Sequence, residues 1–325
     1  MTIIEGMKSP LFFFMEQKQK ITLSSFDKIR KNICILRSYG GLGDIIAMRM
    51  IFEDLKVNYP DFKITWAIPH IYFPIASQHP YIDNIVCSHV YDKKKYLHVY
   101  NLSTICTRHE WKYKKNNTKN RADIWANYFG LELKNHNIFM PRFDEEKDFI
   151  INYLKKLGWD GKKKLIAFAP ISAIPVKNLT SEQCAIIQEM TKDYFLFCIH
   201  TVPILEIAHL KIPTICGTNL KQAMAAVELS TYCISTDTGI MHAAAGYNKP
   251  TLGIFSFVDG YVYCKYYPTV EVVQKHYKDD SDWCGPCHDF VRCPKTTNKL
   301  LKPCISEINK EMIHEKWHIL LNKYR

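Results

Sequence analysis

Short, almost wholly apolar segments alternate along this chain with longer segments whose apolar residues recur every three or four positions. Strands are expected in the first half at residues 33–38, 63–68, 82–86 and 96–102. After the first of them, Ile45, Met48, Ile51, Phe52 and Leu55 share one face of a helix. Another helix is expected at 122–129. Apolar strands separated by helices are typical of a parallel sheet that helices cover.

The second half repeats this alternation. Its strands are expected at 165–169, 195–199, 214–216, 232–235 and 252–255, and its helices near 180–191, 203–210, 219–229 and 239–246. An amphipathic helix at 144–158 separates the two blocks and serves as a hinge. The sequence thus predicts an α/β fold of two Rossmann-like, doubly wound domains that face each other across a cleft, residues 1–155 and 156–325. A C-terminal helix at 306–323 is expected to cross back onto the first domain.

The composition is that of a folded protein with sizeable cores. The 325 residues are 47% hydrophobic and 13% aromatic, which excludes a disordered chain. No apolar run approaches the roughly 20 residues of a membrane span. The run at 11–15 lacks the features of a secretory signal, so we expect a packed arm or buried strand there. These features favour a cytoplasmic protein, with membrane association at the inner face left open.

Twelve cysteines fall into two groups. Several lie in apolar strands, where thiols behave as small hydrophobic groups: Cys34, Cys198, Cys216 and Cys233. A separate cluster consists of Cys284, Cys287, Cys293 and Cys304. Its spacing fits a structural zinc or iron site, but reduced thiols without a metal and a redox pair remain alternatives. A metal bound there would stabilise the loop at 283–304 without taking part in catalysis.

The formal net charge of +11 favours anionic partners, among them phosphorylated sugars, lipid headgroups and nucleic acid. The excess is partly local. One run in the first domain, residues 108–121, has a single acid, Glu110, and two interleaved aromatic residues, Trp111 and Tyr113. Its basic residues are Arg108, Lys112, Lys114, Lys115, Lys119 and Arg121. Such runs are often solvated loops. The functional interpretation is a loop on the acceptor side that binds a phosphorylated group.

Two strand ends carry candidate chemistry. After the strand at 232–235, Asp237, Thr238, Gly239 and His242 stand at the start of a helix of small residues. A helix N-terminus with unpaired N–H groups suits a phosphate; the alternative is a helix cap with a packed histidine.

The strand at 33–38 leads into a glycine-rich turn at 40–43 and then Asp44. As a dinucleotide fingerprint this turn is incomplete, because Ile46 stands where the third glycine belongs. Asp44 is either a catalytic carboxylate or a partner of the helix dipole.

In matching order, three segments resemble the ADP-heptose–lipopolysaccharide heptosyltransferases, glycosyltransferase family 9 with the GT-B fold. They are the Gly-Leu-Gly-Asp44 turn, the strand end at 169–172 followed by Lys177, and the 237–245 motif with Lys249-Pro-Thr. Two features depart from the family: a proline is missing after the first turn, and no aromatic residue precedes Lys177.

The resemblance implies an inverting transfer of a sugar, heptose-type, from a nucleoside-diphosphate sugar to a hydroxyl of a glycan such as lipopolysaccharide core. Asp44 would be the general base, and Lys177, Thr238, Gly239 and His242 would bind the donor diphosphate. Gly43 and Asp237 would support them, while Thr218 and Glu206 would contact the nucleotide. No metal or other cofactor would be needed at the reaction centre. In some relatives a cysteine cluster like this one holds iron.

Three other functions stay open at this point. The same chemistry could use protein or modified DNA as acceptor. The chain could instead be a non-catalytic scaffold of this fold that binds a nucleotide or glycan. A redox or zinc-ribbon protein would depend on the cysteine cluster alone.

Overall fold

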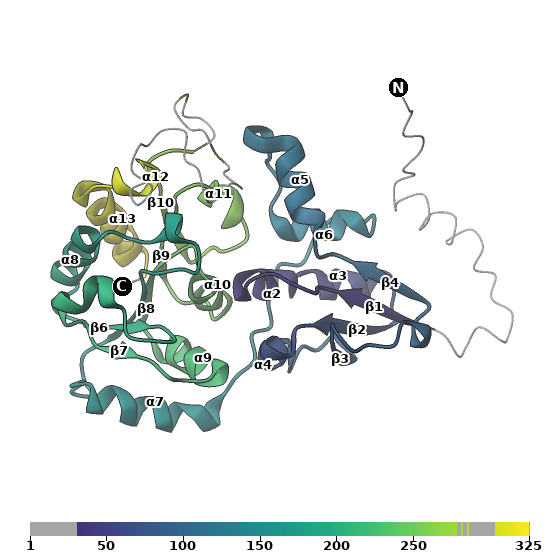
Figure 1. Cartoon of the computed structure of the whole chain (residues 1–325), viewed down its shortest axis with the longest axis horizontal. Coiled ribbons are helices and arrows are strands. Elements are labelled where there is room, and N and C mark those ends of the chain that lie inside the picture. The colour runs from purple at the N-terminus through teal and green to yellow at the C-terminus, as the bar shows by residue number, and fades with distance from the viewer. Residues whose placement is uncertain (1–30, 278–280, 282–284, 286–302, 325) are drawn as a thin grey trace, which may run out of the picture.

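The chain forms two α/β blocks that lie side by side (Figure 1). The computed structural model describes residues 31–277, 281, 285 and 303–324. The predicted arm at 11–15 lies outside the described residues. Within them, no helix is long and apolar enough to cross a membrane.

The first block is built on a four-stranded parallel sheet in the order β3-β2-β1-β4. Its strands are β1 (Asn32–Leu36), β2 (Lys63–Ile68), β3 (Asn84–Cys87) and β4 (His98–Asn101), which confirms the four predicted strands. Its helices are α2 (Leu42–Met48), α3 (Ile51–Asn58), α4 (Phe73–Ala76), α5 (Ile105–Tyr113) and α6 (Arg121–Tyr128), with short 3₁₀ turns at His70–Tyr72, Lys93–Lys95 and Lys114–Asn116.

Two local predictions in this block are wrong. The single helix expected after β1 is interrupted at Arg49 and Met50, where the backbone N–H groups bond three residues back, to Ile46 and Ala47. The turn tightens there but keeps the same face buried. The basic run was expected in a loop, yet its first part forms α5. One side of α5 carries buried Cys106 and Glu110, so tertiary packing favours a helix in a strongly polar segment.

The second block contains a six-stranded parallel sheet in the order β10-β9-β8-β5-β6-β7. Its strands are β5 (Leu165–Ala169), β6 (Phe195–Ile199), β7 (Thr214–Ile215), β8 (Tyr232–Thr236), β9 (Thr251–Ile254) and β10 (Val270–Val273). Its helices are α8 (Ser181–Met190), α9 (Leu220–Leu229), α10 (Gly239–Gly246), α11 (Gly260–Tyr263), α12 (Pro303–Ser306) and α13 (Lys310–Lys323), with 3₁₀ turns at Pro175–Lys177 and Leu205–Leu210. Five of the strands confirm the prediction, whereas β10 was not predicted.

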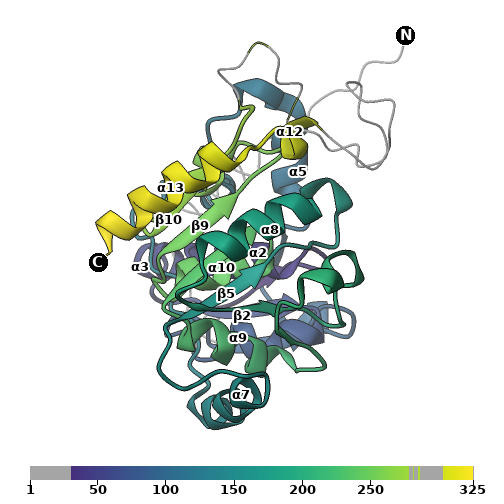
Figure 2. The ribbon, with the colours of Figure 1, turned by 90° about the vertical axis from the view of Figure 1, so that its left-hand side faces the viewer.

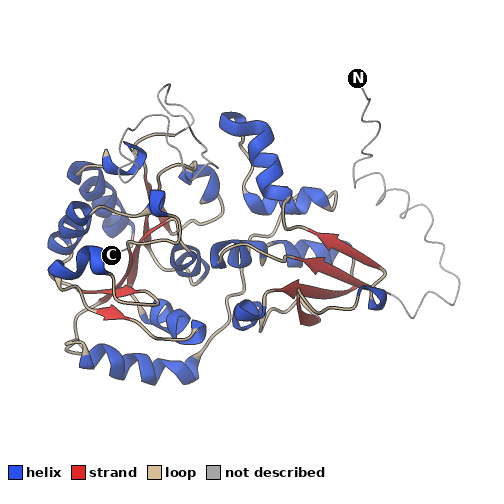
Figure 3. Ribbon diagram, viewed as in Figure 1, coloured by secondary structure: helices blue, strands red, loops and turns tan. Residues whose placement is uncertain are grey.

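Helices cover both faces of the second sheet (Figure 3). Side chains on one face pack with α8 and α13, and those on the other face pack with α9 and α10. The C-terminal helix was expected to cross back onto the first domain, and this is wrong. Helix α13 lies along β9 and β10 (Figure 2), because Ile313, Trp317 and Leu320 are buried against the second sheet.

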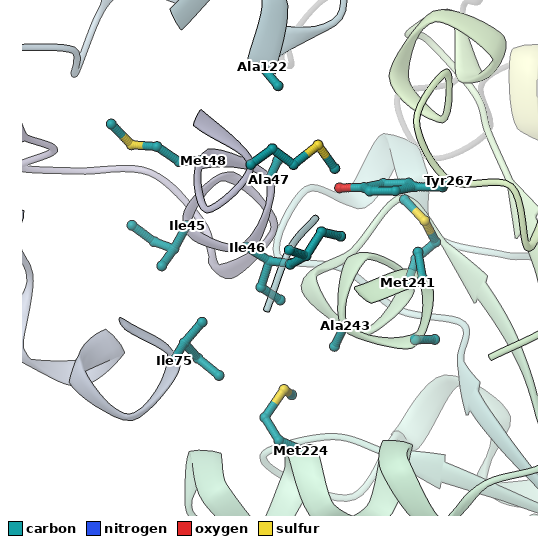
Figure 4. Packing of buried hydrophobic residues seen from close by; sticks show 14 of the residues in the cluster. Ile45, Ile46, Ala47, Met48, Ile75, Ala122, Met224, Met241, Ala243 and Tyr267 are labelled. Carbon is teal, nitrogen blue, oxygen red and sulfur yellow. The ribbon is translucent and has the colours of Figure 1, made fainter. Parts of the chain in front are cut away.

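The two blocks share one continuous apolar core. Helix α2 of the first block packs against α10 of the second, and the buried cluster includes Ile46 on one side and Met241 and Ala243 on the other (Figure 4). The connecting helix α7 (Asp144–Lys156) packs along α9 of the second block. The proposed domain boundary between residues 155 and 156 stays a prediction.

Arg49 helps to hold the connection between the blocks. Its side chain is fully buried, and its guanidinium donates to the backbone carbonyls of Ile75, Ile138 and Phe139. Ile138 and Phe139 belong to the segment that leads to α7. The arginine therefore ties that segment to the first block through hydrogen bonds that compensate for its burial.

Candidate active site

A cleft of about 1880 Å³ lies between the two blocks. Segments that follow the carboxyl ends of strands from both sheets line it, as expected for ligand sites in parallel sheets. The structure brings together most of the predicted site residues on these walls: Gly43, Asp44, Arg121, Lys177, Glu206, Thr218, Asp237, Thr238, Gly239 and His242.

At the N-terminus of α10, Asp237 joins two cationic or potentially cationic groups. Its Oδ2 lies 2.7 Å from Lys177 Nζ, and its Oδ1 lies 3.6 Å from His242 Nε2. The other ring nitrogen of His242, Nδ1, lies 2.8 Å from the hydroxyl of Tyr267. Burial by itself would raise the pKa of Asp237, but Lys177 and His242 hold it well below its usual range. Asp237 is therefore ionised and orients both neighbours.

The Thr238 hydroxyl is already engaged within the protein. It lies 2.9 Å from Ser235 Oγ, which donates its single proton to the Thr236 carbonyl at 2.7 Å. Thr238 must then be the donor to Ser235, so its oxygen remains available as an acceptor. An anionic diphosphate needs donors. The predicted diphosphate-binding role of Thr238 stays a prediction and would require a change in this hydrogen bond.

Two glycines allow the helix ends of the two blocks to meet. A Cβ added to Gly43 would lie 2.5 Å from His242 Cδ2, and one added to Gly239 would lie 2.6 Å from Leu42 Cβ. Both distances are shorter than any real contact of carbon atoms. Gly43 and Gly239 are thus required for close approach between α2 and α10, a steric role that the sequence did not indicate.

On the opposite wall, Asp44 in the first turn of α2 is held by two arginines. Oδ2 accepts a hydrogen bond from Arg37 Nη2 at 2.8 Å, and Oδ1 accepts one from Arg121 Nη1 at 2.5 Å. Burial by itself would raise the pKa of Asp44, but Arg121 and Arg37, with a smaller contribution from His242, lower it to about 2. Asp44 is therefore a carboxylate at neutral pH. Each oxygen still has a lone pair for a further donor.

Arg121 also connects Asp44 to the second block. It donates to both oxygens of the buried Glu110, at 2.7 and 2.9 Å. The Tyr263 hydroxyl of α11 donates to the same carboxylate at 3.0 Å, and the Arg121 guanidinium carbon lies 5.1 Å from the centre of the Tyr263 ring. This network fixes the position of Arg121 beside Asp44 when the blocks are in contact.

Other predicted binding residues have different surroundings. Lys112, Lys114 and Lys115 are exposed at the end of α5 and just after it, and they do not line the cleft. Thr218 lies just before the capped N-terminus of α9, and Glu206 lies in the 3₁₀ turn after β6. Both line the cleft, and their proposed contacts with a nucleotide stay predictions.

The metal prediction falls mostly outside the described residues. Cys284, Cys287 and Cys293 lie there, and only Cys304, in α12, is described. Within the described part of the chain, no group of three or more potential ligands could hold a metal ion. The structural zinc or iron site stays a prediction.

Several residues of the site were not identified from the sequence. Arg37 carried a usable signal, since it is a charged residue at the end of an apolar strand directly before the glycine turn. Glu110 is the single acid in the basic run, and this isolation could have marked it as a partner for a cation. Tyr263 and Tyr267 carried no signal, because only the fold places them against Glu110 and His242.

Part of the chain matches known proteins in sequence. Residues 203–287 match the sequence profile of Glycosyltransferase family 9 (heptosyltransferase). "Putative lipopolysaccharide heptosyltransferase 4" of Escherichia coli (strain K12) is 31% identical over 105 residues. That alignment covers 29% of this chain and 28% of the relative's length.

Solved structures show the same fold over most of the chain. The family 9 glycosyl transferase of Veillonella parvula superposes with a TM-score of 0.67 at 18% identity, covering 91% of this chain and 99% of that one. Escherichia coli ADP-heptose lipopolysaccharide heptosyltransferase II gives 0.60 at 15% identity, with coverage of 90% and 98%. The iron-containing heptosyltransferase TibC of enterotoxigenic E. coli gives 0.65 at 15% identity, with coverage of 91% and 78%.

The sequence match lies in the second block and includes the Asp237–His242 motif, while the structural match extends through both blocks. The two-block α/β fold is that of these GT-B glycosyltransferases. The chain therefore shares the fold of family 9 glycosyltransferases over most of its length, and it matches the sequence profile of that family at residues 203–287.

Proposed function

We propose that this protein transfers a sugar, heptose-type, from a nucleoside-diphosphate donor to a hydroxyl of a glycan acceptor such as lipopolysaccharide core. One observation carries the proposal: the cleft places the ionised Asp44 of one block opposite the Lys177–Asp237–His242 cluster of the other. A carboxylate that can take a proton thus faces groups that can receive a leaving diphosphate. The TibC structure in complex with ADP-D-β-D-heptose supports the choice of donor.

The reaction we propose is a single displacement with inversion. The acceptor oxygen attacks the anomeric carbon while its proton passes to Asp44, and the bond from that carbon to the diphosphate oxygen breaks. Negative charge then grows on the diphosphate. Lys177 is the cation best placed to stabilise it, with the His242 ring and the N–H groups at the start of α10 beside it, and such preorganised charge lowers the barrier.

The two arginines that position Asp44 also lower its pKa, and therefore its strength as a base. Its pKa of about 2 keeps it ionised, but a base works best when its pKa is near the working pH. We propose that the acceptor loosens the contact between Arg121 and Asp44 when it binds. That change would raise the basicity of Asp44 in the complex with substrate. Nucleotide sugars are made in the cytoplasm, and we propose that the protein acts there, at the inner face of the membrane that carries the acceptor.

Replacing Asp44 with asparagine tests the assignment. The variant keeps the shape of the carboxylate, so it should bind ADP as the wild type does, while kcat for transfer from ADP-heptose falls by about 10²-fold or more. ADP, UDP and GDP are compared by thermal shift, and ADP should give the largest rise in Tm. Glu53→Gln, which removes an acid from the first turn of α3 outside the cleft, is the matched control and should keep full activity.

Two results would contradict the proposal in different ways. Full turnover by Asp44→Asn would show that another group is the base. An unchanged Tm with all three nucleotides would argue against a nucleotide-sugar donor.

A further inference from the structure

The acceptor-side wall of the cleft is aromatic. Five side chains of the first block that line the same cleft as Asp44 have rings or large apolar surfaces: Tyr39, His70, Ile71, Phe73 and Trp111. Tyr39 is 52% exposed, Ile71 is 67% exposed and Trp111 is 56% exposed. Large apolar groups that remain exposed within a hollow mark a binding surface more often than a packing defect.

This wall has a defined position relative to Asp44. Tyr39 directly precedes the glycine turn that leads into Asp44. The hydroxyl of Tyr72 donates to the Gly40 carbonyl at 3.3 Å, which attaches the 70–73 turn to the same glycine segment. The rings of His70 and Phe73 pack edge to face, with centroids 4.8 Å apart. A ligand lying on these rings would therefore have its edge near the proposed base.

The charges on this wall are compensated. Among the described first-block residues that line the cleft near Asp44, the arginines are Arg37 and Arg121, and both are paired within the Asp44–Glu110 network. Their side chains are only 5% and 25% exposed. The exposed lysines at the end of α5 do not line the cleft. A phosphate placed here would meet ring faces, which carry partial negative charge, and would displace an existing ion pair.

We propose that this wall binds an uncharged sugar ring of the acceptor by stacking, and that recognition does not depend on a phosphate group. This inference rests on the proposed function and specifies the acceptor class. A pyranose ring presents polarised C–H groups on one face and hydroxyls around its rim. The C–H face suits the negative face of Tyr39 or Trp111, and a rim hydroxyl can then point toward Asp44.

A matched pair of acceptors tests the proposal. The probes are deacylated core oligosaccharide from lipopolysaccharide and the same material after its phosphate esters have been removed with hydrogen fluoride. Transfer from ADP-heptose is followed by ADP release and by the mass of the product. We expect kcat/KM for the two acceptors to agree within about threefold. Tyr39→Ala and Trp111→Ala should each raise KM about tenfold for both acceptors and leave the Kd for ADP unchanged.

Conservative and remote variants provide the controls. Tyr39→Phe and Trp111→Phe keep a ring and should restore most of the lost affinity. Urea unfolding of all four variants shows whether a loss of stability, and not a loss of stacking, explains a raised KM. Val90→Ala alters an exposed apolar residue outside the cleft and should change nothing. Loss of transfer on dephosphorylation, or an unchanged KM in both alanine variants, would overturn the proposal.

Binding measured without transfer separates this inference from the proposed function. Saturation-transfer NMR with the dephosphorylated oligosaccharide reports contact with the protein even if no sugar is transferred. Signals that Tyr39→Ala abolishes, in the absence of any transfer, would support the wall and refute the reaction. Absence of signals with the wild type would refute the wall, whatever the outcome for transfer.

Discussion

Replacing Gly43 with alanine tests whether the two blocks meet in solution through the ends of α2 and α10. The new Cβ would lie 2.5 Å from His242 Cδ2 and 2.9 Å from Nε2. The ring cannot turn away freely, because it is buried, its Nδ1 contacts the Tyr267 hydroxyl and its Nε2 faces Asp237. Either the ring or the whole of α2 must move.

Two opposing terms set the expected size of the effect. Gly43 lies within α2, and alanine in a helix is favoured over glycine by about 0.5–1 kcal/mol. Overpacking at a tight contact costs about 1–3 kcal/mol. The second term is larger, so Gly43→Ala should lower the free energy of unfolding by about 1 kcal/mol. Without the contact, the same substitution would raise it.

A double-mutant cycle with His242→Ala isolates the contact. Removing the ring leaves the new methyl group unopposed, so Gly43→Ala should become neutral or stabilising in that background. Urea unfolding of the four proteins gives a coupling energy that we expect to be about 1–3 kcal/mol. Gly41→Ala, whose Cβ would meet no atom within 4 Å, is the control and should show no such coupling. Equal stabilisation by Gly43→Ala in both backgrounds would refute the contact.

Three further predictions concern charge. In Arg121→Gln the pKa of Asp44 should rise, because a cation that lowers it is gone. The acidic limb of the pH profile of kcat/KM should therefore move to higher pH. Identical pH profiles for the variant and the wild type would show that Arg121 does not lower the pKa of Asp44. Lys177→Met removes the main partner of Asp237, whose lowered pKa stabilises the fold at neutral pH. The loss in unfolding free energy should be constant above the ordinary pKa of 3.8 and shrink as the pH falls below it, and a loss independent of pH in acid urea titrations would contradict this. Arg49→Met leaves several buried carbonyls without donors and should lower the free energy of unfolding by more than about 3 kcal/mol, whereas retention of wild-type stability would show that water replaces the guanidinium.

Much of the fold could be predicted from the sequence, because the spacing of apolar residues along the chain indicates whether a segment is a helix or a strand. The apolar runs that became β2, β5 and β6 were placed at their observed bounds. These strands are largely buried, so β5 and β6 are wholly apolar and β2 is apolar except for Lys63 and Thr65. In contrast, β10 was missed, since Glu271 interrupts its apolar pattern and pairs with Lys316 of α13.

The elements that the sequence misplaced depend on distant partners. Helix α5 was predicted to be a basic loop. Its stability comes from the packing of Cys106 and Glu110 against the rest of the fold and not from the helix propensity of its sequence. The C-terminal helix has an apolar face that would suit either block, and only the tertiary structure shows that Trp317 fits the second.

For the candidate site too, some features could be predicted from the sequence and others only from the tertiary structure. The sequence by itself determined which groups stand at strand ends, among them Asp44, Lys177 and Asp237, because a residue's place after a strand is a local property. The tertiary structure alone decided their state. It placed Arg37 and Arg121 on Asp44, set His242 against Gly43, and left the lysines of the basic run outside the cleft. Electrostatic and steric effects act through space over a few ångströms. Residues that lie this close in space can be far apart along the chain, so the sequence does not show which of them meet.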